Sequence, residues 1–173
     1  MKKILLCFLC LFLTLSVNSI GYTFQVNYKF EAIYVYSFTK YISWPDDVVQ
    51  SQFVIGVYGF SPMHQELATV TNGKLVGDKS ILVKSFKTKE EIDNCQILFI
   101  PSDYMDELPS FIKIANSKHI LLVTEEANAG YTVAGINLVK VDGKQKFELN
   151  EAMVKKAGLK ISNQLLPLAI LVK

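Results

Sequence analysis

Side chains that commonly carry catalysis are sparse in this 173-residue chain and stand far apart. His64 and His119 have no cysteine or histidine partner at metal-ligand spacing, so we expect no metal site. Ser61 lacks the second glycine of a nucleophile elbow, and Pro62 after it is typical of a helix start. Because a nucleophile, a base and an orienting group nowhere occur together, we expect neither an enzyme nor a bound cofactor.

Three cysteines offer thiol chemistry, but two of them fall in an apolar leader. Cys7 and Cys10 have the C-x-x-C spacing of redox motifs, yet they belong to a segment that we expect to be removed. Cys95 is then alone, so no intramolecular disulfide can form even after export. Its place before the apolar stretch 96–100 favours a buried, unreactive thiol; the alternative is an exposed thiol for redox sensing or for pairing with another molecule.

Residues 1–21 have the layout of a secretory signal peptide. A positive start at Lys2 and Lys3 precedes an apolar run over residues 4–15, and small or polar residues follow. The run is shorter than the ~20 residues that a membrane-spanning helix needs. We predict cleavage after Ser19 or after Gly21, which leaves an exported domain over residues 22–173 that does not insert into the membrane.

The charge balance argues against a nucleic-acid partner. All 18 basic residues are lysine, and without the leader the chain carries as many basic as acidic residues. Arginine is the side chain that binds phosphates and base edges bidentately, and no basic stripe is evident in the sequence. We therefore expect no binding to DNA or RNA.

The elements that would position the remaining polar residues alternate along the chain. Apolar runs typical of buried strands occupy residues 53–59, 80–86, 96–100 and 119–124. Helices are predicted from Ser61, from Thr88, over 102–116 and over 150–156. A hairpin over 135–149 turns at Asp142-Gly143. This order predicts a single α/β domain of the Rossmann-like or flavodoxin-like class, with a mostly parallel sheet, helices on both faces and an antiparallel C-terminal hairpin.

The first predicted helix covers residues 25–44 and ends before Pro45. One broad face collects most of its large apolar side chains and is expected in the core: Val26, Phe30, Ile33, Tyr34, Phe38, Tyr41 and Trp44. A second stripe, Tyr28, Val35 and Ile42, lies off this face with Tyr36 nearby. A helix with two apolar stripes is buried on two sides or contacts another molecule. The stripe is therefore a candidate interface, for a partner protein or a second copy, unless the apolar segment 165–172 or another helix covers it.

A second candidate site lies where parallel strands would end. Ser61 starts a helix directly after a strand and Gly59, and the N-terminus of such a helix can hold an anion in the crevice beyond the strand ends. Glu125 and Asn128 belong to a polar loop after another strand. The sequence therefore also predicts, as the alternative function, a small-ligand-binding crevice formed by Gly59, Ser61, Glu125 and Asn128.

Several stretches of the chain resemble the YfiR family of exported bacterial proteins. Lys40-Tyr41-Ile42-Ser43-Trp44-Pro45 is similar to the signature that ends the family's first helix. Residues 53–59 and 94–100 resemble its first strand and its cysteine-led strand. Residues 135–138, 146–150 and 157–166 resemble its Gly-Ile-Asn-Phe, Phe-Glu-Ile-Asn and Gly-Leu-x-Ile-Ser-Ser-x-Leu-Leu segments.

The resemblance implies a small periplasmic α/β protein without catalytic activity. A well-known member represses a membrane diguanylate cyclase by binding its periplasmic sensor domain, which lowers cyclic-di-GMP and restrains biofilm formation. The resemblance thus implies a regulator whose partner is the periplasmic domain of a membrane sensor, either a diguanylate cyclase or a histidine kinase. Members under redox control carry cysteine pairs, so with Cys95 alone the resemblance implies no disulfide switch here.

Overall fold

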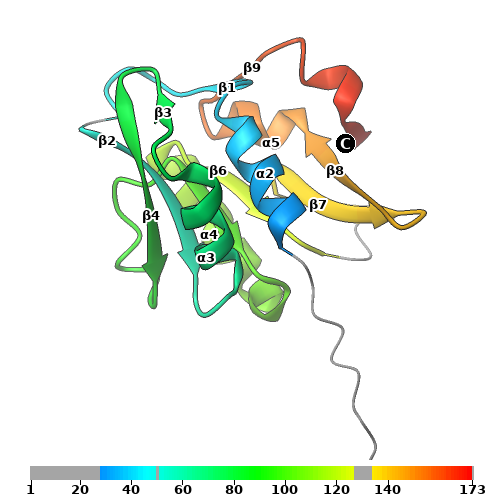
Figure 1. The fold of residues 1–173 in the computed structure, drawn as a ribbon, viewed down its shortest axis with the longest axis horizontal. Helices are drawn as coiled ribbons and strands as arrows, with labels where there is room; N and C mark the ends of the chain where they lie inside the picture. Colours follow the sequence, from blue (N-terminus) through cyan, green and yellow to red (C-terminus); the bar gives the residue numbers. More distant parts are fainter. Residues whose placement is uncertain (1–27, 50, 127–133, 173) are drawn as a thin grey trace, which may run out of the picture.

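The computed structural model describes residues 28–49, 51–126 and 134–172, so the predicted leader lies outside the described residues. Its centre is an eight-stranded sheet (Figure 1). In order across the sheet the strands are β10 (Ile170–Val172), β8 (Lys144–Asn150), β7 (Ile136–Val141), β6 (Leu121–Thr124), β5 (Ile97–Ile100), β2 (Gln52–Tyr58), β4 (Lys79–Phe86) and β3 (Leu75–Val76). All neighbouring strands from β4 to β7 are parallel. At the two sides of this group, β3 pairs antiparallel with β4, and β8 pairs antiparallel with β7. The predicted fold class and C-terminal hairpin are confirmed.

Two hydrophobic cores cover the two faces of this sheet. On one face, α2 (Lys29–Phe38) and α3 (Met63–Thr71) lie side by side, and α5 (Glu151–Lys156) adds Val154 to the same core (Figure 1). On the other face, a 3-10 helix η1 (Ser102–Glu107) leads into α4 (Leu108–Lys118). Neighbouring residues of β2 alternate between the cores, as side chains of a strand must: Val57 enters the first and Tyr58 the second.

Two local predictions differ from the structure: the helix expected from Thr88 and the single apolar segment expected over residues 165–172. No helix forms at Thr88; instead, the Glu91 carboxylate accepts a hydrogen bond from the Lys87 amide at 2.7 Å within a turn. The predicted last apolar segment divides into a 3-10 helix η2 (Leu166–Leu168) and β10, which pairs parallel to β8. Pro167 fits this division because proline is tolerated in the first turn of a helix.

The first helix is shorter than predicted and is rotated away from the expected orientation. Helix α2 ends at Phe38, and Ile42–Ser43 forms a short strand, β1, that pairs with β9 (Lys160–Ile161) in a separate two-stranded sheet. Ala32, Val35 and Phe38 are completely buried. Phe30 and Ile33, which were expected in the core, are 60% and 44% exposed.

This orientation corrects the predicted interface at Val35 and Ile42. Val35 is fully buried and Ile42 is 3% exposed, and both belong to the core between α2, α3 and the sheet. Neither side chain can therefore offer a surface to a partner or to a second copy. Tyr36 is half-buried, and Tyr28, also half-buried, is the N-cap residue of α2.

Two aspartate substitutions on α2 test its orientation. Val35→Asp places a charge in the core and is expected to lower the free energy of unfolding by ~3 kcal/mol or more. Ile33→Asp, two residues away on the exposed side, is expected to change it by less than ~1 kcal/mol. Chemical denaturation measures both. Similar losses in the two variants would contradict this orientation.

Candidate functional site

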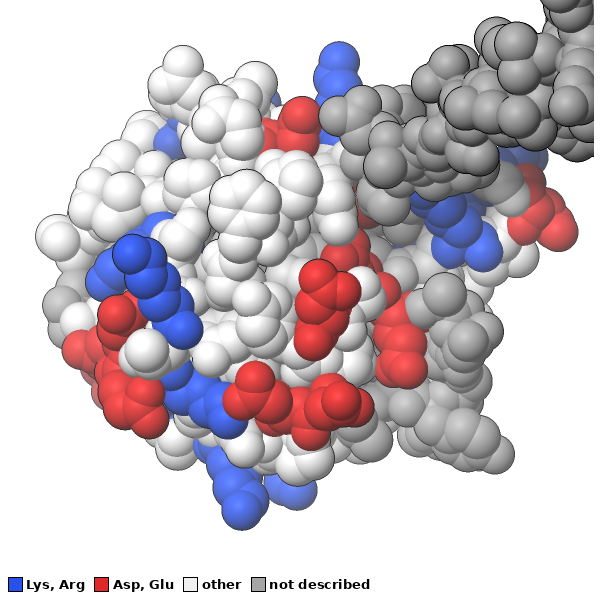
Figure 2. Space-filling view, turned by 90° about the horizontal axis from the view of Figure 1, so that it is seen from below, with Lys and Arg blue, Asp and Glu red and all other residues white. Residues whose placement is uncertain are grey.

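Tyr28 joins the two sites that the sequence predicted separately. Its hydroxyl donates to Glu125 Oε1 at 3.0 Å, and the Ser102 amide donates to the same oxygen at 3.3 Å. Its ring meets Phe99 of β5 edge to face at 6.4 Å between centroids. Glu125 directly follows β6 and Ser102 follows β5, so Tyr28 lies over the carboxyl ends of these parallel strands. Acidic side chains, with lysines among and beside them, lie on the end of the molecule where β2 and β4 finish (Figure 2).

Burial shifts the protonation of this pair. Burial, and then the charge of Glu125, raises the pKa of Tyr28 to about 12, so the phenol stays protonated and remains a donor. Burial also raises the pKa of Glu125, against the hydrogen bonds from Tyr28 and from the Ser102 amide; Glu31 and Asp103 raise it further. Glu31 and Asp103 therefore add negative charge near Glu125.

The predicted crevice residues have different positions relative to Tyr28. Ser61 is 8% exposed, its Oγ accepts a hydrogen bond from the Met63 amide at 3.2 Å at the start of α3, and it also interacts with the Tyr28 hydroxyl. Gly59 has a φ of +66°, and a β-carbon there would collide with the Tyr104 ring. Asn128 lies outside the described residues. The Tyr104 ring therefore occupies the space beside Gly59 beyond the end of β2, and the carboxylate of Glu125 disfavours the anion that the sequence predicted there.

A cavity of about 250 Å³ opens beside this cluster, and sequence reasoning missed it. Its lining residues are Tyr28, Glu31, Ser102, Glu125, Leu138, Val139, Lys140 and Gln145. Glu31 is 4% exposed, and Lys140 Nζ stands 3.9 Å from its Oε1. The spacing in the sequence could have indicated this cavity residue. Glu31 is four residues before Val35, so the two lie on the same side of the helix, and a rotation that buries Val35 also brings Glu31 towards the sheet.

Asn137 fixes the segment that carries Glu125. Asn137 is fully buried, and its Oδ1 accepts hydrogen bonds from Thr124 Oγ1 at 2.9 Å and from the Glu126 amide at 2.8 Å. Its Nδ2 donates to the Glu126 carbonyl at 3.1 Å and to Glu148 Oε2 at 3.0 Å. All four polar contacts of the amide are satisfied, so this residue of the Gly-Ile-Asn stretch positions the chain on both sides of Glu125.

Other stretches of the family resemblance lie elsewhere and have structural roles. The Trp44 indole donates a hydrogen bond to the Gln96 carbonyl at 2.9 Å, directly before β5. Strand β1 pairs with β9, so the stretches Ile42–Trp44 and Lys160–Ile161 contact each other near the starts of β2 and β5. Gln96 is 1% exposed, accepts a hydrogen bond from the Val54 amide at 2.6 Å and donates to the Val48 carbonyl.

Cys95 has the setting of a structural thiol. It is 2% exposed, its Sγ donates to the Ile97 carbonyl at 2.8 Å, and burial raises its pKa to about 12. The thiolate is the form that reacts with oxidants and disulfides, so this burial and pKa leave the thiol unreactive near neutral pH. The geometry gives no support to the redox alternative.

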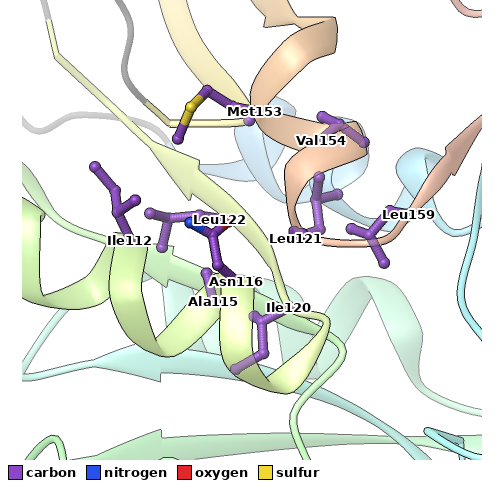
Figure 3. Close-up of a pocket in the computed structure, with 11 residues that line it drawn as sticks. Ile112, Ala115, Asn116, Ile120, Leu121, Leu122, Met153, Val154 and Leu159 are labelled. Carbon is purple, nitrogen blue, oxygen red and sulfur yellow. The ribbon is translucent and has the colours of Figure 1, made fainter.

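A further apolar hollow between α4 and α5 offers no room for a ligand. Ile112 and Ala115 of α4 face Met153 and Val154 of α5 across it (Figure 3). Its volume is about 10 Å³, which is space for no more than a water molecule. The hollow is therefore a small packing gap lined by residues of α4, β6 and α5.

The described residues around Tyr28 form an arrangement that could bind a ligand. In the ranges 28–49, 51–126 and 134–172 no three histidine, cysteine or acidic side chains gather to hold a metal ion. Over the same ranges, no helix is long and apolar enough to cross a membrane. The Tyr28 cluster provides a half-buried tyrosine, two carboxylates and an adjoining cavity.

Comparison with known proteins places nearly all of the described chain in one family. Residues 28–170 match the model of a family described as YfiR/HmsC-like. A search of curated proteins returned no match. The match starts at Tyr28 and includes Glu125, Asn137 and the pair of short strands, and it confirms the resemblance that the sequence motifs indicated.

Replacing Glu125 with glutamine tests the electrostatics of the cluster. The raised pKa means that the folded state holds this proton more tightly than the unfolded state. The ionised carboxylate therefore destabilises the fold above that pKa, and the cost disappears as the pH falls below about 4.5, the ordinary value. Glu125→Gln keeps an oxygen for Tyr28 and Ser102 without the charge. It is expected to be at least as stable as the wild type near neutral pH, and this advantage should fade in acid.

Thermal unfolding between about pH 4 and pH 8 measures this difference. Glu126→Gln, at the exposed neighbouring residue, is the matched control and should show no such trend. A wild type that is more stable than Glu125→Gln near neutral pH would contradict the assignment.

Proposed function

The chain belongs to the YfiR/HmsC-like family, and from this premise we propose that it is an exported regulator that binds the periplasmic domain of a membrane signalling protein. The family suggests a periplasmic regulator. The partner proposed for this chain is the external domain of a diguanylate cyclase or of a histidine kinase. The observation that carries the proposal is the family match over residues 28–170.

The mechanism is a shift between two states of the partner. A bound regulator changes the output of a sensor only by the difference in its affinity for the active and inactive states. Preferential binding to the inactive state would restrain the cyclase or kinase, and release would restore its output. No covalent chemistry is needed, which agrees with the setting of Cys95.

We assign the contact to the outward side of α2. Phe30 and Ile33 are one turn apart on this side and are 60% and 44% exposed. Tyr36 follows one turn later, and the ammonium groups of Lys40 and Lys74 lie 5.2 and 4.9 Å from the centre of its ring. This α2 patch (Phe30, Ile33, Tyr36 and Lys40) combines apolar anchors with positive charge at one end. It fits a protein surface with an apolar centre and an acidic rim.

Aspartate substitutions in the α2 patch test the proposed contact. Phe30→Asp and Ile33→Asp put a charge where apolar area is to be buried, and each is expected to weaken binding by at least about tenfold without a comparable loss of stability. The ligands in the binding assay are the purified periplasmic domains of a membrane diguanylate cyclase and of a membrane histidine kinase from the same organism.

Leu75→Asp is the matched control, because Leu75 is 58% exposed but lies on the edge strand β3. It should bind like the wild type. Unchanged binding by Phe30→Asp and Ile33→Asp would refute the α2 patch, and no binding by the wild type to either class of external domain would refute the proposed function.

Export is proposed from the leader and has its own test. The mature protein recovered from the periplasmic fraction is expected to begin at Ile20 or Tyr22, as determined by N-terminal sequencing or intact mass. A chain that remains in the cytosol with Met1 attached would contradict export, and with it the proposed partner.

A further inference from the structure

We propose that the cavity beside the first turn of α2 binds a small organic cation, an amine that carries its ammonium group on a short alkyl chain. This site lies on the inward side of α2 and does not depend on the identity of a protein partner. Its volume of about 250 Å³ is below the ~300–1,000 Å³ of common ligand pockets, which suits a molecule of a few carbon and nitrogen atoms.

Glu31 is the first observation that calls for a ligand. The residue lines the cavity, is 4% exposed, and its Oε2 accepts no hydrogen bond in the described structure. A buried acceptor without a partner costs ~1–3 kcal/mol, and more when it is charged. The terminal torsion of a glutamate is broad, so a small rotation of the carboxylate can turn either oxygen towards a bound donor.

Lys140 does not meet this need. Its ammonium is 3.9 Å from Glu31 Oε1, beyond hydrogen-bond distance, and its side chain is 57% exposed. An ion pair with a largely solvated lysine at this distance stabilises the Glu31 carboxylate only slightly. The carboxylate therefore retains capacity for a closer positive charge.

Gln145 adds a second unused acceptor on the same cavity. Its Nε2 donates to the carbonyls of Val139 and Lys146, each at 3.1 Å, which fixes the orientation of the amide. The Oε1 that this leaves is buried and accepts no hydrogen bond within the described ranges. An ammonium group has three donors, and the cavity offers Glu31 and Gln145 as acceptors for it.

Two of the donors that line the cavity are already engaged, and its carboxylates outnumber its one ammonium, so an anionic ligand fits poorly. The Tyr28 hydroxyl and the Ser102 amide both donate to Glu125. Two carboxylates, Glu31 and Glu125, face the cavity against the one ammonium of Lys140. The described residues provide no set of three metal ligands, which favours an organic cation over a metal ion. Leu138 and Val139 supply an apolar wall for the alkyl chain.

Calorimetry of the mature chain with putrescine and spermidine tests the site, with butanediol as the uncharged analogue and sodium chloride at matched ionic strength. We expect saturable binding of at least one amine, together with a rise in the melting temperature, and neither effect with butanediol or salt. Absence of binding by both amines, or equal stabilisation by butanediol, would overturn the proposal.

Three substitutions locate the amine. Glu31→Gln keeps the shape of the side chain and is expected to weaken binding at least about tenfold, whereas Lys140→Met removes the competing positive charge and should tighten it. Glu66→Gln, on α3 and outside the cavity lining, is the matched control and should bind like the wild type. Circular dichroism confirms that each variant is folded. Equal binding by Glu31→Gln and the wild type, or weaker binding by Lys140→Met, would overturn the assignment, because the amine would then be held elsewhere.

Discussion

The position of α2 on the sheet is the constraint on which the functional surfaces depend. The helix is only ten residues long and would be marginally stable by itself, so contacts with the rest of the fold must stabilise it and set its position. At its N-terminal end, the hydrogen bond from Tyr28 to Glu125 holds the helix in place. After its C-terminal end, the pairing of β1 with β9 holds the chain that leaves it. Burial of Ala32, Val35 and Phe38 then sets its rotation. With the rotation set, Glu31 must lie at the cavity and Phe30 and Ile33 must face outward.

Several stretches that identify the family serve to place α2 and its surroundings. Trp44 and the β1–β9 pair hold the chain that leaves the helix, and Asn137 holds the segment that presents Glu125 to Tyr28. These residues make their contacts inside the fold, and none of these contacts involves the exposed side chains of α2. A family defined by such positions shares a scaffold, and function has to be argued from the surfaces that the scaffold displays.

The sequence predicted the six strands from β4 to β8 across the sheet, because each is marked by its own local pattern, but it did not predict the short edge strands β3 and β10. Runs such as Phe53–Tyr58 are continuous and apolar, and Asp142-Gly143 marks the hairpin turn. Ser61 and Glu125 could be grouped in advance, since carboxyl ends of parallel strands meet at one edge. The rotation of α2 could not be predicted, because apolar residues occur on several sides of the helix. Bonds to Glu125, Gln96 and β9, all distant in sequence, decide between these faces.

The cavity and the α2 patch are two sides of the same helical turn, and this has a thermodynamic consequence. Glu31 lies between Phe30 and Ile33 in sequence, so a cation held by Glu31 acts on the backbone that also carries the patch. If partner binding moves this turn, the affinity for the cation changes, and by linkage the cation changes the affinity for the partner by the same factor. If the turn does not move, no difference in free energy arises and the two ligands bind independently. Signal input through the cavity therefore requires movement of the first turn of α2, and the Tyr28–Glu125 bond that fastens this turn is the contact such movement has to strain or break.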